Sequence, residues 1–166
     1  MGVPKALREA EFDVGDVQWA TAVDRATLAE WRRRNLLDVG RVQRGAAGTV
    51  FDRDDVQRIA LMQELADAGL DQTRAGLVAA LVEMPVFDPA ARSWVLVPPR
   101  HPDRPLFEYL RGSPKGALQR EGGGAPSRAG VLVNVAASAA DVDLLLAQRL
   151  WRRLGNKFSM EELGLV

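Results

Sequence analysis

The chain has 166 residues, nearly half of them apolar, and its 22 basic and 22 acidic side chains give a net charge of zero. That length fits one or two small domains, and the charge balance excludes binding to nucleic acid through bulk positive charge alone. The lack of Cys excludes disulfides and thiolate metal sites, and a single His cannot build a His-based metal site.

No secretory signal pattern opens the chain. The longest uncharged run, Ala129 to Ala140, is about half of what a membrane span needs. We therefore expect a cytoplasmic protein without metal, cofactor or membrane contact. Arg greatly outnumbers Lys and Ala is abundant, a composition that is typical of a GC-rich bacterial genome.

The first half of the chain predicts a run of short helices. Residues 1–13 mix charge with Ala and are expected to form a flexible arm. A short helix is expected from about Asp16 to Ala22. Asp24 can accept hydrogen bonds from the free amides at a helix start, which predicts a second helix over Arg25–Arg34. Asn35 tolerates the left-handed conformation that ends helices, so the second helix should stop there.

A basic hairpin is predicted after the second helix. It spans about Val39 to Phe51, with a Gly-rich tip at Arg44–Gly48 and a β-prone return strand. Asp52 and Asp55 then have capping-box spacing, and the helical period of the apolar residues predicts a helix over Asp54–Ala68. A basic helix, a basic hairpin and a further helix are the layout of a winged helix-turn-helix.

A fourth helix is predicted to begin after Asp71, its capping residue, and to end before Pro85. Gly69 ends the helix before it. The buried face of this fourth helix is expected to consist of Leu77, Val78, Leu81 and Val82.

The second half of the chain predicts a small α+β unit. Ser93–Val97 and Gly130–Val135 are predicted strands because they are rich in apolar and β-branched residues. Leu106–Leu110 is either one helical turn or a short strand. The segment Gly112–Arg128 contains five Gly and is expected to be a mobile loop.

A longer helix is predicted to follow the last strand. Ser138, with Asp141 three residues on, should cap this helix, which runs to about Leu154. The expected fold class is therefore mainly α: an N-terminal winged helix-turn-helix followed by a small α+β domain. We divide the chain into an arm at 1–13, a winged helix-turn-helix domain at 14–84, a small α+β domain at 90–155 and a tail at 156–166.

Several short sequence motifs share their order and spacing with one known family. They are Val23-Asp24-Arg25-Ala26-Thr27-Leu28, Trp31, Leu36-Leu37, Gly48-Thr49-Val50-Phe51-Asp52, Asp54-Asp55-Val56 and Leu65-Ala66-Asp67-Ala68-Gly69-Leu70. Through these motifs Gly15–Leu81 resembles the DNA-binding domain of the MerR family of transcription regulators, over about two fifths of the chain. The resemblance implies a two-fold dimer on double-stranded DNA, with each recognition helix in a major groove and each wing on the flanking backbone.

A local basic patch supplies the candidate DNA contacts. Between Arg25 and Arg44 six Arg stand against two acids, a net of +4, whereas residues 1–80 as a whole hold 11 basic and 13 acidic side chains. Base contacts come from the N-terminal part of a recognition helix, and the Arg fork can bond a phosphate twice. The candidates are Arg25 toward a base, Thr27 toward a base edge or a phosphate, and Arg32, Arg33, Arg41 and Arg44 toward phosphates.

The second half is expected to form the dimer. Two strands alone are marginal, so the α+β unit should pair with a second copy. Its strands and helix carry more apolar surface than they can cover internally, and Trp is enriched at interfaces. The candidate dimerisation residues are Trp94, Val131, Val133, Leu145, Leu146 and Trp151.

Two other classes stay open. One is a phage- or mobile-element-type DNA architectural protein, such as an excisionase or a packaging subunit. The other is a protein-interaction module that has lost DNA binding, which the substitution of Ala29 and Glu30 for the family's usual base-reading residues favours. An enzyme is the least expected class, because no set of nucleophile, base and acid stands together. RNA polymerase is a further candidate partner of a regulator.

Overall fold

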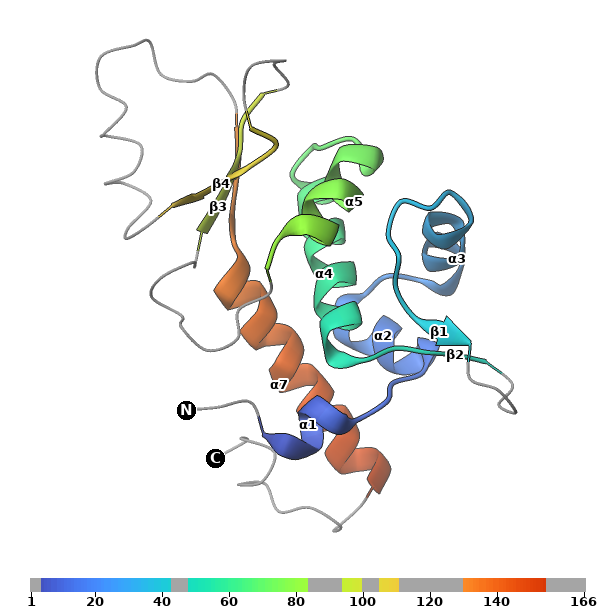
Figure 1. The fold of residues 1–166 in the computed structure, drawn as a ribbon. Helices are drawn as coiled ribbons and strands as arrows, with labels where there is room; N and C mark the ends of the chain where they lie inside the picture. Colours follow the sequence, from blue (N-terminus) through green and yellow to red (C-terminus); the bar gives the residue numbers. More distant parts are fainter. Residues whose placement is uncertain (1–3, 43–47, 84–93, 100–104, 111–129, 155–166) are drawn as a thin grey trace.

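The computed structural model describes residues 4–42, 48–83, 94–99, 105–110 and 130–154. These residues form a mainly helical chain with a two-stranded hairpin in its first half and a three-stranded sheet in its second (Figure 1). The elements of the first half are α1 (Lys5–Glu9), α2 (Val14–Thr21), α3 (Arg25–Arg33), β1 (Arg41–Val42), β2 (Thr49–Val50), α4 (Arg53–Asp67) and α5 (Gln72–Leu81). Those of the second half are β3 (Trp94–Val97), β4 (Glu108–Leu110), β5 (Val131–Asn134) and α7 (Val135–Leu154). The fold class predicted from the sequence is confirmed.

Aspartates set the starts of the helices. The Asp52 carboxylate accepts a hydrogen bond from the Asp55 amide at 2.8 Å, and the Asp55 side chain accepts one from the Asp52 amide in return, which confirms the predicted capping box of α4. Asp71 caps α5 as predicted. Asp13 and Asp16 form a second capping box, so α2 begins at Val14 rather than near Asp16.

Residues in the left-handed conformation end two of the helices where the sequence predicts it. Asn35 follows α3 with φ of 52°, and Gly69 follows α4 with φ of 96°. A third such residue, Ala22 with φ of 58°, ends α2. This bend turns the chain from α2 into α3.

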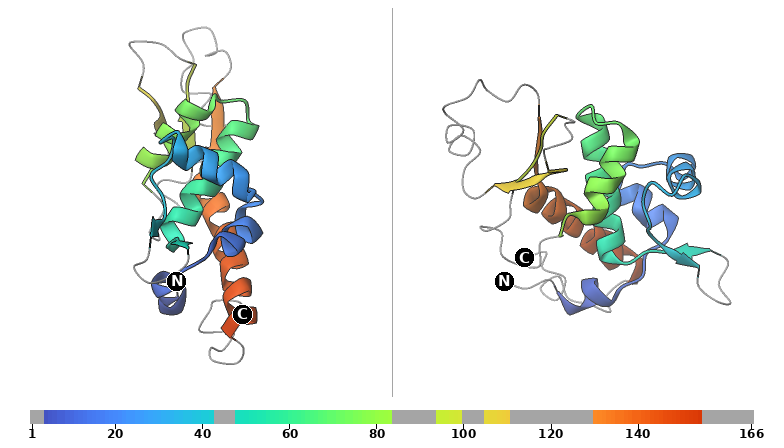
Figure 2. Two further views of the ribbon diagram at one scale, coloured as in Figure 1. Left: turned by 90° about the vertical axis from the view of Figure 1, so that its right-hand side faces the viewer. Right: turned by 45° about the horizontal axis from the view of Figure 1, so that its top comes forward.

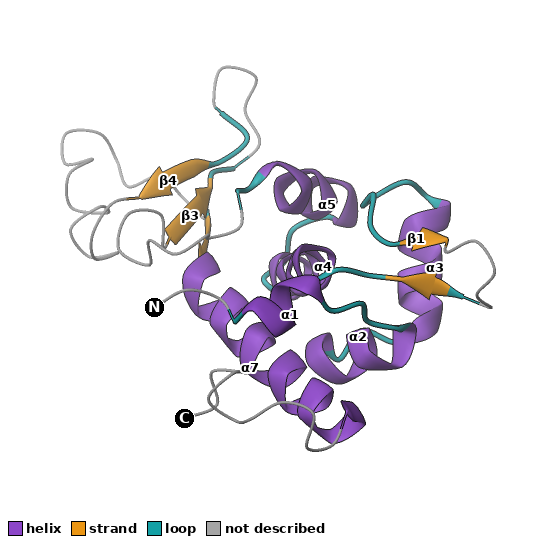
Figure 3. Cartoon of the chain, turned by 60° about the horizontal axis from the view of Figure 1, so that its bottom comes forward, coloured by secondary structure: helices purple, strands orange, loops and turns teal. Residues whose placement is uncertain are grey.

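The second half of the chain packs directly on the first. α7 runs along α4 and α2 and also contacts α1 (Figure 3). Val56, Ile59 and Met62 of α4 belong to one continuous hydrophobic core with Val142 and Leu146 of α7. One hydrophobic core thus spans both halves of the described chain.

The sheet has the strand order β4-β3-β5, and all its pairings are antiparallel. Val95 of β3 lies between Tyr109 of β4 and Val133 of β5. The segment Leu106–Leu110 thus contributes a strand rather than a helical turn. The sheet and the β1–β2 hairpin lie on opposite sides of the helical core (Figure 2).

The N-terminal arm is docked, unlike the flexible arm that was expected. Leu7 in α1 is buried, and α1 packs on α7. Phe12 is buried as well and pairs with Phe51 as an antiparallel bridge, with both N–H···O distances at 2.9 Å. The described part of the arm is therefore held by hydrophobic burial and by main-chain hydrogen bonds.

Two helical details also differ from the prediction. α7 begins at Val135, because the Asn134 side chain accepts a hydrogen bond from the Ala137 amide at 3.1 Å, so Ser138 lies inside the helix. The expected buried residues Leu77 and Leu81 of α5 are exposed. The expected mobile loop at 112–128 lies outside the described residues.

The packing of α5 explains that exposure. A Cβ atom at Gly76 would overlap the Leu36 carbonyl oxygen, so α5 approaches the end of α3 with its smallest residue. Ala75, Val78, Ala79 and Val82 make up the rest of the buried face. The leucines are consequently turned toward the opposite side of the helix.

Candidate nucleic-acid interface

A short turn joins α2 to α3. The Thr21 hydroxyl donates to the Val17 carbonyl oxygen at 2.8 Å and accepts from the Val23 amide at 3.2 Å, which holds the bend at Ala22. Val17 and Val23 are buried beneath the turn. Two helices joined by such a short turn are the arrangement of a helix-turn-helix.

Asp24 organises the start of α3. Its carboxylate accepts hydrogen bonds from the Thr27 amide at 2.8 Å and from the Thr27 hydroxyl at 2.9 Å. The Thr27 amide bond, followed by the hydroxyl bond, lowers the pKa of Asp24 because both stabilise the charged form. The Thr27 hydroxyl proton is thus already engaged, and its oxygen can only accept a further hydrogen bond.

The outer face of α3 is cationic at both ends and small in the middle. Leu28 and Trp31 are buried in the core, whereas Arg25, Ala29 and Arg33 are exposed on the other side. Methyl side chains permit close approach to a surface and can contact the methyl group of thymine. The sequence offered Ala29 only as a departure from the family's base-reading residues, whereas its exposed methyl group leaves room for close approach.

Arg33 lies against Glu30 one turn earlier on α3. Its Nε and Nη2 donate to the two Glu30 oxygens at 2.8 and 2.7 Å. The side-chain hydrogen bond with Arg33 lowers the pKa of Glu30 below its ordinary value, and the same bond raises that of Arg33. Both side chains are largely open to solvent, so a phosphate can compete for Arg33.

Arg32 and Arg34 are bound to neighbouring elements. Arg32 Nη1 donates to the Thr49 hydroxyl at 2.8 Å, which ties α3 to the return strand of the hairpin. Arg34 Nη1 donates to the Gln72 side-chain oxygen at 2.9 Å, which ties α3 to α5. Arg32 therefore fixes the angle between the helix and the hairpin, a role that the charge pattern alone did not reveal.

The hairpin is anchored at its first strand. The Gly40 amide donates to the Asp55 carboxylate at 3.1 Å, and Gly40 has φ of 73°, a conformation that glycine adopts without strain. Burial raises the pKa of Asp55. The exposed Arg41 pairs with Glu11 at 2.6 Å, and Val42 next to it is exposed. This end of the hairpin thus offers both a cation and an apolar side chain to solvent.

Residues 12–75 match the family model of MerR HTH family regulatory proteins. This part of the chain is a MerR-type helix-turn-helix domain. The match covers α2, α3, the hairpin and α4, and ends within α5. A comparison with curated proteins found no match. The hairpin β1–β2 is accordingly the wing of the MerR-type domain.

The MerR-type domain brings most of the predicted DNA contacts onto one side of the molecule. Arg25, Thr27 and Arg33 lie on α3, and Arg41 lies on the adjoining wing, so the two elements share one surface (Figure 3). Arg32 joins α3 to the return strand of the hairpin through its hydrogen bond with Thr49. Arg44, predicted at the wing tip, lies outside the described residues.

The predicted dimerisation residues divide into two groups. Val133 and Leu146 are buried in the core of the chain itself, which leaves them no surface to offer a partner. Trp94, Val131 and Leu145 are half-buried. Trp151 is 36% exposed near the end of α7. Leu144, part of the same apolar run as Leu145 and Leu146, is 47% exposed.

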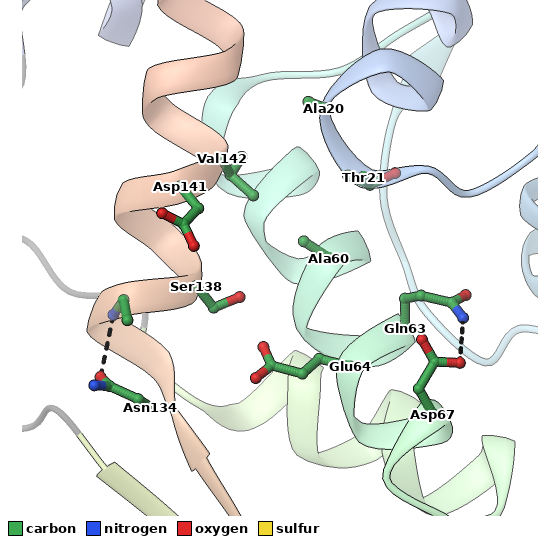
Figure 4. Close-up of a pocket in the computed structure, with 11 residues that line it drawn as sticks. Ala20, Thr21, Ala60, Gln63, Glu64, Asp67, Asn134, Ser138, Asp141 and Val142 are labelled. Carbon is green, nitrogen blue, oxygen red and sulfur yellow. Dashed lines mark hydrogen bonds between the residues drawn. The ribbon is translucent and has the colours of Figure 1, made fainter.

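A cleft of about 420 Å³ lies between α2, α4 and α7 (Figure 4). Glu64, Ser138 and Asp141 project into it, while Asp67 accepts a hydrogen bond from Gln63 at 2.7 Å. The cleft is acidic, with Glu64, Asp67 and Asp141 in its lining. Its carboxylates repel a polyanion, so the cleft itself does not suit nucleic acid.

Among the described residues, no group of acids and His could hold a metal ion. In the same part of the chain, no helix is long and apolar enough to cross a membrane.

Proposed function

We propose that the protein is a DNA-binding transcription regulator that acts as a homodimer on double-stranded DNA. In each copy α3 enters the major groove and the wing contacts the flanking backbone. The observation that carries the proposal is that the family match coincides with the α2–turn–α3–wing arrangement. The proposal assigns no catalytic step, and RNA polymerase is the partner that a promoter-bound regulator would influence.

The start of α3 supplies the base contacts in this proposal. Arg25 is the first residue of α3 and is exposed, so its fork can reach the two acceptor atoms of a guanine. Ala26 and Ala29 are exposed further along the helix and suit thymine methyl groups. The expected half-site therefore combines one G·C pair with neighbouring A·T pairs.

The exposed ion pairs supply the backbone contacts. Arg33 and Arg41 are held by Glu30 and Glu11, and exposed ion pairs of this kind contribute little to folding. Phosphate can therefore replace the carboxylate at modest cost. Each phosphate contact releases counterions, so the affinity should fall steeply with salt.

The outer face of α7 is the proposed dimer interface. Val142, Leu146 and Leu150 point into the core of the chain, and the opposite side carries Leu144 and Trp151. These two exposed apolar residues are seven positions apart, which places them on one side of a helix. Two helices can pack along such a stripe.

An antiparallel pairing about a two-fold axis makes that stripe self-complementary. With Leu144 at the axis, Trp151 of one copy lies opposite Ala137 of the other, because each is seven residues from the centre.

The DNA-binding test is a titration of labelled fragments selected from the protein's own genome. We expect tight binding to selected fragments, weaker binding to scrambled ones and a marked salt dependence for both. Absence of binding to either DNA at low salt would contradict the proposed function.

The dimer test is sedimentation of the full chain. Leu144→Asp should shift the equilibrium strongly toward monomer, because it introduces a charge at the centre of the interface. Leu81→Asp is the matched control, since Leu81 is an exposed leucine on α5. A wild-type monomer at micromolar concentration, or equal effects of the two substitutions, would exclude α7 as the interface.

A second candidate function is that of a protein-interaction module. It is favoured by the intramolecular partners of Arg32, Arg33 and Arg41, and by the exposed leucines Leu77 and Leu81 on α5. In that case none of the DNA titrations would show binding. Charge substitution of the α5 leucines would then disrupt binding of a protein partner.

A further inference from the structure

The same short sequence motif occurs at the start of α2 and at the start of α4, and the two copies together form the base of the wing. Phe12-Asp13-Val14-Gly15-Asp16 precedes Val17, and Phe51-Asp52-Arg53-Asp54-Asp55 precedes Val56. The two phenylalanines pair through main-chain hydrogen bonds, and the aspartates form the two capping boxes. Since β2 ends directly before Phe51, the position of this paired base sets the position of the wing.

α7 holds the α4 side of this base through Asp143. The Nε and Nη2 atoms of Arg53 donate to the two Asp143 oxygens at 2.8 and 2.7 Å, and Arg53 is only 6% exposed. Gln57 donates to the same carboxylate at 2.9 Å. Arg53 is the second residue after Phe51, so this bidentate pair fixes both the distance and the angle between α7 and the end of the wing.

α7 holds the α2 side through two arginines. Arg149 Nε and Arg153 Nη1 donate to the two oxygens of Asp16 at 2.8 and 2.6 Å, and Asp16 is 1% exposed. Arg153 Nη2 also donates to the Glu11 carbonyl oxygen at 2.9 Å. This bond ties α7 to the residue before Phe12, and so to the paired base of the wing.

Ion pairs of this kind specify geometry more than they add stability. Removing charges from water costs free energy that offsets much of the attraction between them, and apolar residues of similar size often stabilise a fold equally well. Apolar contacts alone would let α7 slide along α4 and α2. A buried carboxylate, Asp16, and a half-buried one, Asp143, remove that freedom through their directed donors.

We propose that α7 fixes the base of the wing and that Asp143 and Asp16 are positioning residues for the wing's contact with DNA. The inference rests on the proposed function for its effect on DNA, but the hold on the wing base can be measured without DNA. It extends the functional unit beyond residues 12–75 to a helix that begins 60 residues further along the chain.

The test uses Asp143→Asn and Arg153→Gln in the full chain. The first replaces the carboxylate with a neutral group of the same shape. The second removes a donor that is partly exposed, so the variant should still fold. Amide exchange at Phe12 and Phe51 reports on the wing base, exchange at Val82 reports on α5 as an internal reference, and binding to a selected fragment reports on function.

We expect both variants to exchange faster at the two phenylalanine amides, with Val82 unchanged. DNA affinity should fall by about 2- to 30-fold, the range of a coupling through packed elements. The control is Asp141→Asn, which removes an exposed carboxylate from the same helix. It should change neither the amide exchange rates nor the DNA affinity. A double variant that exchanges the charges, Arg53→Asp with Asp143→Arg, should recover part of the loss.

The outcomes separate the two claims. If both single variants fold and neither exchange nor affinity differs from the Asp141→Asn control, the inference is overturned. If exchange at the wing base increases but wild-type protein binds no DNA, α7 holds the wing base as inferred and the proposed function fails.

Discussion

Arginine meets carboxylate on two sides of this molecule, and the two sides differ in how far water reaches the pair. On the α3 and wing side, Arg33 with Glu30 and Arg41 with Glu11 are open to solvent. On the α7 side, Asp16 is almost fully buried beneath its two arginines, and Arg53 is buried beside Asp143. The same chemistry therefore produces exchangeable contacts on one side and fixed contacts on the other.

The difference shows how a chain without net positive charge can present a cationic surface. Exposed pairs cost little to open, so their arginines can turn to an incoming phosphate. Buried pairs cannot open without leaving a charge in a dry site. The molecule thus keeps its adaptable arginines where DNA is proposed to bind and its fixed arginines where one helix must be held against another.

The largest effect should come from removing the buried carboxylate of the α7 side. Asp16→Ala leaves Arg149 and Arg153 without their shared partner and removes one half of the α2 capping box. We expect a loss of about 3 kcal/mol in the free energy of unfolding, at the lower end for buried pairs because the arginines are partly exposed. Urea denaturation measures it, with exposed Asp38→Ala as the control that should change little.

The buried Arg53–Asp143 pair tests whether charge or packing stabilises the α7 interface. Arg53→Met should lower the free energy of unfolding by about 2 kcal/mol, because Asp143 then loses its bidentate partner. Arg53→Met with Asp143→Leu should restore most of that loss. Equal losses in the single and double variants would show that packing, and not charge pairing, dominates there.

Much of the first half could be predicted because its signals are local. The Asp52–Asp55 spacing, and the left-handed positions at Asn35 and Gly69, each depend on a few neighbouring residues. The buried face of α5 could not be predicted, since both sides of that helix are apolar and only the approach of Gly76 to the end of α3 selects one of them.

The packing of α7 could not be predicted from the sequence, for a different reason. Its partners lie far away along the chain, as with Asp16 and Arg149, and no spacing rule links them. One signal was present and was missed: the motif Phe-Asp-x-x-Asp occurs at both Phe12 and Phe51, and the structure pairs the two copies. A repeat that short also occurs by chance, so it becomes informative only when the structure shows that the two helix starts lie side by side.

A smaller effect is expected on the exposed side. Glu30→Gln removes a charge that both repels phosphate and holds Arg33. DNA affinity should rise for all sequences, and the salt slope should steepen by about one unit as Arg33 gains a phosphate. The thermal midpoint should stay unchanged. A drop in affinity would show that Glu30 itself takes part in the contact.

The smallest effect is a titration. Because the Arg33 hydrogen bond lowers the pKa of Glu30, the favourable contribution of this pair is present above the ordinary Glu pKa. It is lost as the pH falls through the lowered pKa. NMR titration of the Glu30 carboxyl should show the pKa return toward its ordinary value in Arg33→Ala. An unchanged value would mean that the two side chains do not pair in solution.

The central claim is that α3 and the wing form a DNA-binding surface, and Arg25 tests it most directly. The measurement is affinity against salt for wild type, Arg25→Ala and Arg41→Ala, on a selected site and on a scrambled one. Arg25→Ala should cost about 1–3 kcal/mol on the selected site and much less on the scrambled site. Arg41→Ala should weaken both alike and reduce the salt slope by about one unit. Unchanged affinity of both variants on both DNAs would contradict the account.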